Sequence, residues 1–358
     1  MIKLFDPVVG KEEERAILKT LKSHFWASGA GTGDVFRFEN EFNKYIGSEQ
    51  CVSVNSGTAA LHLALSLIEI KNKEVILPSL SFVSTAHAII YNGGKPIFVD
   101  IDPNTLCIDP HVVNKSITKK TAMILPVHFA GMSCDLNELM GLCEEHNITL
   151  IEDAAHAAGS FYRGKKIGTH SLAACFSFHP VKNLSMPTGG AITLNGKQSD
   201  KFKTSLNIRR WCGISNRKET TYDINELGWN YYMNEFSAAI GLEQLRKLDH
   251  MNNKRRKIAK RYSNELELDK KMPFNEECSY HFYWIQVRSR SNFMKCLKQN
   301  GVETGIHYKP IHQMGFYKSK LKLPITESVA ESIVSIPIHP NLTEYDISKI
   351  IKSVNRFS

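Results

Sequence analysis

Three places in the sequence put chemically useful side chains at the ends of apolar segments. Lys182 lies between two strand-like stretches, residues 173–178 and 190–194. Asp153 ends another apolar stretch, and the Asn-Ser-Gly-Thr sequence at residues 55–58 opens an apolar segment of helical character. An amine, a carboxylate and a hydroxyl-rich helix start are suited to forming an imine, pairing with a cationic ring nitrogen and binding a phosphate.

Lys182 is the centre of this pattern. An exposed lysine has a pKa of roughly 10.4 and is a poor nucleophile until it is desolvated or held in an imine. Apolar residues that include Phe178 and Met186 flank Lys182, and Gly189 and Gly190 would let the backbone pass close to a ligand. The alternative is a loop lysine that points into water, and only the companion residues argue against it.

Asp153 and His156 would face the same site. A buried carboxylate is costly unless it is paired, and a protonated pyridine nitrogen is such a partner. An acid at this place is also a common helix N-cap. His156 follows three residues later and is expected to contact a cofactor ring. A histidine satisfied within the core is the alternative.

A phosphate seat is predicted at Ser56, Gly57 and Thr58, where free backbone N–H groups and the helix dipole attract an anion. A plain serine or threonine cap is the alternative. Ser177 would add a hydroxyl, and Phe82 would either stack on a ring or be an ordinary core aromatic. An amine, an acid and a phosphate seat are what pyridoxal phosphate (PLP) requires of a protein.

Short apolar segments alternate with helical ones through the first two-thirds of the chain, which predicts an α/β domain with a largely parallel sheet. Ligands of such sheets bind beyond the carboxyl ends of the strands, where Asp100, His128 and Asp153 emerge. We expect a large domain over residues 1–250 and a smaller α+β domain over 251–358. The polar stretch 207–230 is predicted to be a long loop.

Composition narrows the class of protein. The 358 residues carry a formal charge of +9, and 42% are hydrophobic. No apolar stretch reaches the roughly 20 residues of a membrane span, and no signal peptide is evident, so we expect a cytoplasmic protein. Eight scattered cysteines argue for reduced, buried thiols and against a metal site. The basic stretch 254–257 is interpreted as a solvated helix face, without a nucleic-acid-binding motif.

Matching stretches over nearly the whole chain resemble the DegT/DnrJ/EryC1/StrS family, the PLP-dependent sugar aminotransferases with the aspartate aminotransferase fold (fold type I). They are residues 25–29, 55–61, 98–102, 127–131, 152–156, 176–182, 228–231 and 238–242. The resemblance implies that Lys182 forms the Schiff base and Asp153 pairs with the ring nitrogen. It also implies that Gly57, Thr58 and Ser177 bind phosphate.

The resemblance implies further that Phe82 stacks on the ring, that His156 occupies a position often held by glutamine, and that the protein is a homodimer with active sites at the interface. Asn230 would reach the phosphate in the neighbouring subunit. Two departures stand out: Met-Pro-Thr-Gly-Gly at 186–190 replaces Gly-Glu-Gly-Gly, and Tyr232 replaces an arginine. Candidate substitutes for that lost cation are Arg209, Arg210 and His307.

The sequence therefore predicts a PLP-dependent aminotransferase. The expected substrate is a nucleotide-linked keto-sugar of the 4-keto-6-deoxyhexose class, with glutamate as the amino donor; the net positive charge would help to attract this anion. Two alternatives stay open: a cyclitol or other keto ring as substrate, and a non-catalytic sensor or binding protein of the same fold. Lys182 itself argues against the family's dehydratase branch, in which histidine replaces the lysine.

Overall fold

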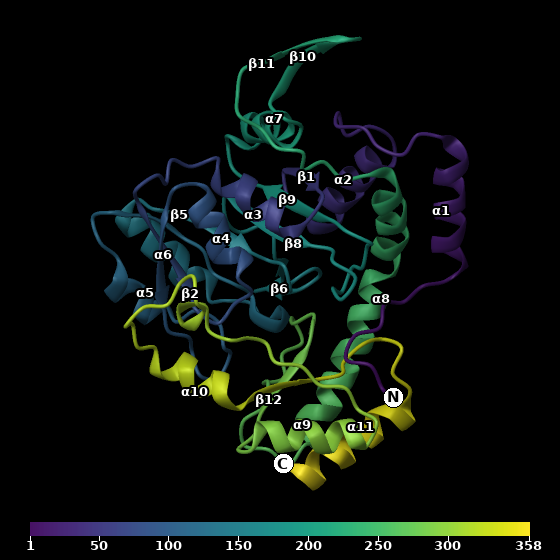
Figure 1. Ribbon diagram of the computed structural model, residues 1–358, viewed down its shortest axis with the longest axis vertical. Coiled ribbons are helices and arrows are strands. Elements are labelled where there is room, and N and C mark those ends of the chain that lie inside the picture. Colours follow the sequence, from purple (N-terminus) through teal and green to yellow (C-terminus); the bar gives the residue numbers. More distant parts are fainter.

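A computed structural model describes residues 1–358 and is built around a seven-stranded sheet (Figure 1). All neighbouring strands are parallel except β9, which is antiparallel to both β1 and β8. The predicted α/β fold with a mostly parallel central sheet is confirmed. In sheet order the strands are β1 (Gln50–Val54), β9 (Gly190–Leu194), β8 (Ala173–Ser177), β5 (Thr149–Asp153), β4 (Thr121–Ile124), β2 (Glu74–Pro78) and β3 (Lys95–Val99).

The sheet is covered on both faces, which explains why its strands are apolar without alternation. Successive strand side chains point to opposite faces, and in β2 Ile76 belongs to one hydrophobic cluster while Val75 and Leu77 belong to another. Helices α3, α4 and α7 supply residues to the second cluster, and α2, α5, α6 and α8 supply residues to the first. A loop that leaves the carboxyl end of a strand is thus held between two packed layers.

Helices make up most of the remaining regular structure. Helix α3 begins at an N-cap serine, and α6 at an N-cap aspartate that accepts a backbone N–H. The helices are α1 (Lys11–Ser23), α2 (Gly33–Ile46), α3 (Gly57–Leu65), α4 (Ser84–Tyr91), α5 (Pro110–Ser116), α6 (Leu136–His146), α7 (Ser199–Arg210), α8 (Glu235–Glu265), α9 (Arg290–Gln299), α10 (Pro324–Ser332) and α11 (Glu344–Phe357).

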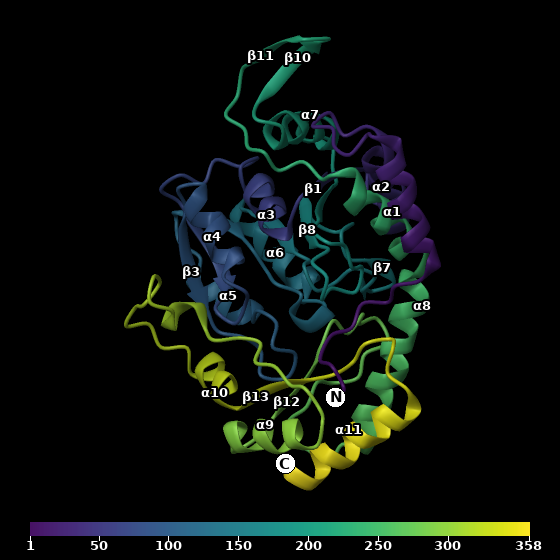
Figure 2. The same cartoon turned by 45° about the vertical axis from the view of Figure 1, so that its right-hand side comes forward.

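Helix α8 is one continuous element of 31 residues that runs along the side of the molecule (Figures 1 and 2). Its basic stretch is not wholly solvated, contrary to prediction. Arg255 is only 4% exposed and donates to the Ile338 carbonyl at 2.8 Å, while Arg256 donates to the carbonyls of Cys278 and Gly159. These arginines tie α8 to neighbouring loops, a role that charge alone does not reveal. The predicted domain boundary at residue 250 lies inside α8 and stays a prediction.

The C-terminal part combines helices α9 to α11 with a two-stranded antiparallel sheet, β12 (Tyr283–Gln286) and β13 (Ile333–Ile336). The first residues of the chain join it, because Ile2 forms a parallel bridge with Val302. Both termini lie at this end of the molecule (Figure 1). A further short hairpin, β6 (Phe161–Tyr162) and β7 (Lys165–Lys166), follows β5.

Residues 207–230 are not the irregular loop that was predicted. Helix α7 extends to Arg210, and β10 (Ile214–Lys218) pairs antiparallel with β11 (Thr221–Ile224). This hairpin projects from the body of the molecule (Figures 1 and 2), and most of its side chains are exposed. Because neither face is buried against this chain, the strands lack the apolar pattern by which a strand is recognised.

The cysteines bear out the predicted buried thiols. All eight are free, and six of them are buried, whereas Cys212 is exposed and Cys296 is intermediate. No set of three or more histidine, cysteine or acidic side chains is arranged to hold a metal ion. None of the helices combines the length and the apolar character needed to cross a bilayer.

Candidate active site

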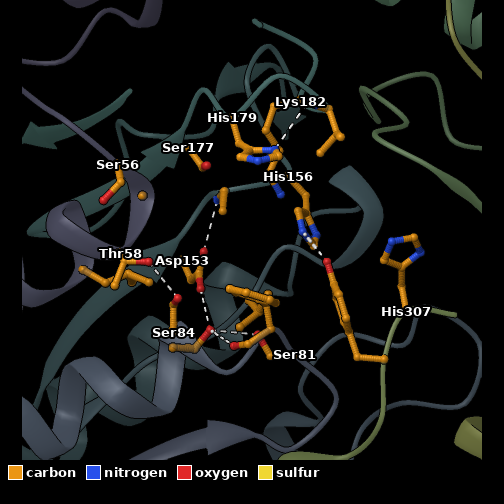
Figure 3. A pocket seen from close by; sticks show the side chains of 18 of the residues that line it. Ser56, Thr58, Ser81, Ser84, Asp153, His156, Ser177, His179, Lys182 and His307 are labelled. Carbon is orange, nitrogen blue, oxygen red and sulfur yellow. Dashed lines mark hydrogen bonds between the residues drawn. The ribbon is translucent and has the colours of Figure 1, made fainter. Parts of the chain in front are cut away.

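A cavity of about 330 Å³ lies at the carboxyl ends of the sheet strands. It brings together eight of the nine predicted site residues from four separate parts of the chain (Figure 3). Those eight are Ser56, Gly57, Thr58, Phe82, Asp153, His156, Ser177 and Lys182. The ninth, Asn230, does not line it. The companion motifs therefore meet in space as the sequence indicated.

Lys182 is held by a compact turn that follows β8. Its backbone N–H donates to the His179 carbonyl at 2.8 Å, and its own carbonyl accepts from Ser185 Oγ at 2.7 Å. The side chain enters the cavity, where Nζ lies 3.4 Å from His281 Nε2. Burial lowers the pKa of the amine to about 8, against the opposing pull of the Asp153 carboxylate. The alternative of a loop lysine in water is excluded.

Asp153 ends β5, the strand between β4 and β8, and is 3% exposed. Its Oδ2 accepts from Thr85 Oγ1 at 2.7 Å and its Oδ1 accepts from the Ala155 N–H at 3.1 Å. Burial raises the pKa of the Asp153 carboxyl, although both hydrogen bonds and the Lys182 charge oppose that rise. The carboxylate is thus fixed in orientation and still has room for a cationic partner.

The predicted phosphate seat is the N-terminus of α3. Ser56 caps the helix by accepting from the Ala59 N–H at 3.1 Å, and Thr58 Oγ1 lies 2.7 Å from Ser84 Oγ. A side chain at Gly57 would place Cβ only 2.6 Å from the Ser177 Cβ, so glycine is required for α3 to sit against the end of β8. Exposed helix N–H groups beside three hydroxyls form an anion site.

His156 is buried, and its two ring nitrogens are both engaged. Nδ1 accepts from the Ala130 N–H at 3.3 Å, and Nε2 lies 3.2 Å from Tyr308 Oη. Burial first, and then the charge of Lys182, hold the pKa of His156 well below its ordinary value. A neutral ring at this place can cover an aromatic cofactor without bringing a second cation beside Lys182.

Phe82 lies at the rim of the cavity and is 57% exposed, so it is not an ordinary core aromatic. Its ring centroid lies 6.1 Å from that of Tyr308, and the two rings flank the opening. An aromatic of this size left open to solvent beside a cavity is available to cover a planar ligand. The predicted stacking on a ring stays a prediction.

Several residues that were candidates for the site serve the scaffold instead. Asp100 accepts from the Ile325 and Thr326 N–H groups at the start of α10. His128 pairs with Glu152 at 2.7 Å and is fully buried behind the cavity.

Arg209 and Arg210 were candidates to replace the family arginine that is absent at Tyr232. Both are excluded, because each already has a partner. Arg209 pairs with Glu226, and Arg210 is buried in an ion pair with Glu39. His307 alone of the three candidates lines the cavity. Burial lowers its pKa to about 4, so a neutral imidazole, not a cation, stands there.

Sequence reasoning missed several residues that contact the predicted ones, among them Thr85, Tyr308 and His281. Thr85 lies in the hydroxyl-rich segment around Phe82, and that clustering was the available signal. Tyr308 and His281 come from the C-terminal part of the chain, more than 90 positions from Lys182, and contact the site only through the tertiary fold. Neither carries a local pattern that points to the cavity.

The cavity fits PLP on three independent features. Gly57 leaves a space beside Ser177 that a Cβ would fill, the α3 N-terminus supplies unpaired N–H donors, and Asp153 has an orientation fixed by Thr85. Ser56, Thr58 and Ser177 would hold the phosphate, Asp153 the ring nitrogen, and Lys182 the aldehyde carbon.

Comparison with known proteins agrees with this geometry. The model of the DegT/DnrJ/EryC1/StrS aminotransferase family matches residues 7–355. An uncharacterised protein of Methanocaldococcus jannaschii, MJ1066, is 34% identical over 98% of this chain and 96% of its own.

Two solved structures share the fold over nearly their whole lengths. Helicobacter pylori PseC, an aminotransferase involved in the biosynthesis of pseudoaminic acid, superposes with a TM-score of 0.93 at 27% identity, over 99% of this chain and 98% of its own. The PLP form of Spr1654, a putative sugar aminotransferase of Streptococcus pneumoniae, gives a TM-score of 0.93 at 25% identity, over 99% and 97%.

Proposed function

Because the chain belongs to the DegT/DnrJ/EryC1/StrS aminotransferase family, we propose that it uses PLP to transfer an amino group from glutamate to a nucleotide-linked keto-sugar of the 4-keto-6-deoxyhexose class. The observation that carries this proposal is one cavity in which the Lys182 amine, the Asp153 carboxylate and the α3 N-terminus converge. The involvement of PseC in the biosynthesis of pseudoaminic acid supports the substrate class.

PLP, when bound, supplies the aldehyde carbon and the electron-withdrawing ring on which an amino group can be exchanged. Lys182 would hold the cofactor and, once released from it, would take a proton from the donor carbon and return it to the cofactor's former aldehyde carbon, on the other side of the transferred nitrogen. Its lowered pKa of about 8 leaves a useful share of neutral amine near neutral pH. Asp153 would accept a hydrogen bond from the N–H of the cofactor ring and so keep the ring nitrogen protonated.

The remaining residues bind and exclude water. Ser56, Thr58, Ser177 and the first N–H groups of α3 would fix the phosphate and so hold the cofactor at a constant point. His156 covers one side of the ring position and is itself fixed by Tyr308. Because His156 and His307 are neutral, neither adds a second positive charge beside Lys182.

We propose further that the protein is a homodimer with shared active sites. Asn230 is exposed and lies outside the cavity of its own chain, which fits a residue that serves the partner's phosphate seat. Mixing an Asn230→Ala chain with a Lys182→Ala chain tests this, since one of the two sites in a mixed dimer would be intact. Recovery of activity on mixing supports sharing, and a monomer by sedimentation contradicts it.

The substrate is tested by incubating the purified holoenzyme with glutamate and a panel of keto-sugar nucleotides and keto-cyclitols, with mass spectrometry of the products. A mass change from ketone to amine on a 4-keto-6-deoxyhexose nucleotide is expected. Amination of a keto-cyclitol but of no keto-sugar nucleotide would show that the substrate is a cyclitol instead. A protein that binds PLP but shows no half-reaction with any amino acid would be the non-catalytic binding protein.

The role of Lys182 is tested with Lys182→Ala. We expect this variant to fold and to lose transamination by at least about a thousandfold, because both the attachment point and the base are removed. Borohydride reduction of the wild-type holoenzyme should attach the cofactor irreversibly to Lys182, as read by peptide mass spectrometry. Normal turnover by Lys182→Ala, or labelling elsewhere, would refute the assignment.

A further inference from the structure

His281 is a buried histidine that faces the catalytic lysine from the C-terminal part of the chain. It precedes β12, its backbone N–H donates to the Ala130 carbonyl at 2.9 Å, and its side chain is 2% exposed. The ring is packed between Phe5, stacked at 5.4 Å between centroids, and His156, at 4.7 Å. These contacts fix the plane of the imidazole.

The side chain of His281 has a single hydrogen-bond partner. Nε2 lies 3.4 Å from Lys182 Nζ, and this is the only hydrogen bond of the side chain, because Nδ1 is buried without a partner. A histidine retained for packing alone gains nothing from a buried nitrogen without a partner, which costs free energy relative to an apolar ring. The one polar contact of the ring is with the lysine amine.

The protonation of the pair follows from its surroundings. Burial, and then the charge of Lys182, hold the pKa of His281 well below its ordinary value, so the imidazole is neutral. In a neutral imidazole one nitrogen donates and the other accepts. With the proton on Nε2, His281 donates to the lone pair of an uncharged lysine amine, and the unpartnered Nδ1 is then an acceptor. A buried acceptor without a partner is less unusual than a donor.

We propose that His281 is a positioning residue that holds the Lys182 amine at the cavity wall, uncharged, whenever that amine is not bonded to the cofactor. This inference rests on the proposed function, because such a free amine is the base of the transfer. The donor from Nε2 stabilises the neutral form of the lysine, and the fixed ring limits where Nζ can go. A base held within reach of the reacting carbon raises the rate by positioning.

Other charged and titratable groups around the pair act in known directions. Asp153 favours the protonated amine, while Arg255, His156 and His307 disfavour a proton on His281. His281 is thus the group beside Lys182 that can favour its neutral form by a hydrogen bond.

Two substitutions separate positioning from packing. His281→Phe keeps an aromatic ring between Phe5 and His156 but removes the polar atom. His281→Gln keeps a donor at nearly the same reach but loses the ring. We expect the phenylalanine variant to lower kcat by about 10- to 100-fold with little change in KM, and the glutamine variant to recover much of it. His170→Phe is the matched control, because His170 also has one hydrogen bond and an unpartnered Nδ1, but its hydrogen bond is to the Tyr162 carbonyl and not to Lys182.

A second readout needs no turnover. Lys182 in the cofactor-free protein is labelled with trace acetic anhydride across pH, and the modified peptide is measured by mass spectrometry. The labelling midpoint should lie near the lowered pKa of about 8 in the wild type. It should move upward by about one unit in His281→Phe, since a hydrogen bond to the neutral form is lost.

Each outcome decides the proposal. An unchanged labelling midpoint in a folded His281→Phe, or full kcat in His281→Phe with loss in His281→Gln, would overturn it. If His281→Phe fails to fold, the labelling midpoint of His281→Gln decides: it supports the proposal if it stays at the wild-type value and overturns it if it moves up by about one unit. A wild-type protein without transamination would instead defeat the proposed function, while its labelling curve still reports on this contact.

Discussion

Thr85 Oγ1 donates a 2.7 Å hydrogen bond to Oδ2 of Asp153, although the two residues lie 68 positions apart in the chain. Helix α4 begins at the residue before Thr85, and β5 ends at Asp153, so the bond joins a helix start to a strand end beneath the cavity. It orients the carboxylate on which the proposed binding of the ring nitrogen depends.

Replacing Thr85 by valine keeps the shape of the side chain and removes this bond. The pKa of Asp153 should rise further, because the Thr85 hydrogen bond lowers it. Since a hydrogen bond to a charged group contributes about 1.5–3 kcal/mol, we expect cofactor affinity to fall roughly 10- to 100-fold. Equilibrium titration of the cofactor-free protein measures this. Thr204→Val, on the exposed side of α7, should have no effect, and equal affinity in both variants would contradict the role of Thr85.

Substituting Gly57 by alanine should damage the phosphate seat. Its Cβ would lie 2.6 Å from the Ser177 Cβ, so α3 and β8 must move apart at a cost of about 1–3 kcal/mol. Both the free energy of unfolding and cofactor affinity should fall, as measured by denaturant titration with and without PLP. Gly141→Ala in α6 is the control, since a Cβ there meets no atom within 4 Å and should stabilise the helix by up to about 1 kcal/mol. If Gly57→Ala left both the free energy of unfolding and cofactor affinity unchanged, the close packing of α3 against β8 would not matter for the phosphate seat.

The lowered pKa of Lys182 predicts how stability depends on pH. Between about pH 8 and the ordinary lysine pKa of 10.5, the unfolded chain binds a proton at Lys182 that the folded chain does not. The free energy of unfolding of the cofactor-free protein should therefore rise with pH in this window, at up to about 1.4 kcal/mol per pH unit. Urea unfolding across this range tests it, and Lys182→Met should lack this contribution. Identical slopes for both proteins would contradict the pKa shift.

The buried pair of His128 and Glu152 predicts how the free energy of unfolding depends on pH in the acidic range. Burial raises the pKa of Glu152, but hydrogen bonds from His128 and Ser171 outweigh it and hold the pKa below its ordinary value. The carboxylate therefore contributes stability above about pH 4.5 that is lost as the pH falls through its folded pKa.

His128→Leu should destabilise the protein by about 3–5 kcal/mol, because it leaves Glu152 buried without its partner. Denaturant unfolding at neutral pH measures the loss. The double variant His128→Leu with Glu152→Leu should recover part of it, since no uncompensated charge then remains. A double variant as unstable as the sum of the single ones would show that the two residues do not act as a pair.

The sequence alone was sufficient for the parallel core and for the residues at its strand ends. Apolar segments without alternation are buried on both sides, and this pattern is local, so β2, β4, β5 and β8 were evident. Lys182, Asp153 and the segment 55–58 could be predicted from the same pattern, because Asp153 ends an apolar strand, the segment 55–58 opens an apolar helix and Lys182 lies between two apolar strands. The short hairpin of β10 and β11 could not be predicted in this way, because neither strand has an apolar face that packs against this chain.

Tertiary structure alone decided which polar residues surround the lysine. Tyr308 reaches the cavity and His281 reaches the Lys182 amine because the C-terminal part of the chain folds back over the carboxyl ends of the sheet. Arg255 appeared in a basic stretch that predicts a solvated face, yet packing around α8 buried it against backbone carbonyls. Local sequence records hydrophobic periodicity and helix starts, whereas burial and pKa depend on which distant segments pack together.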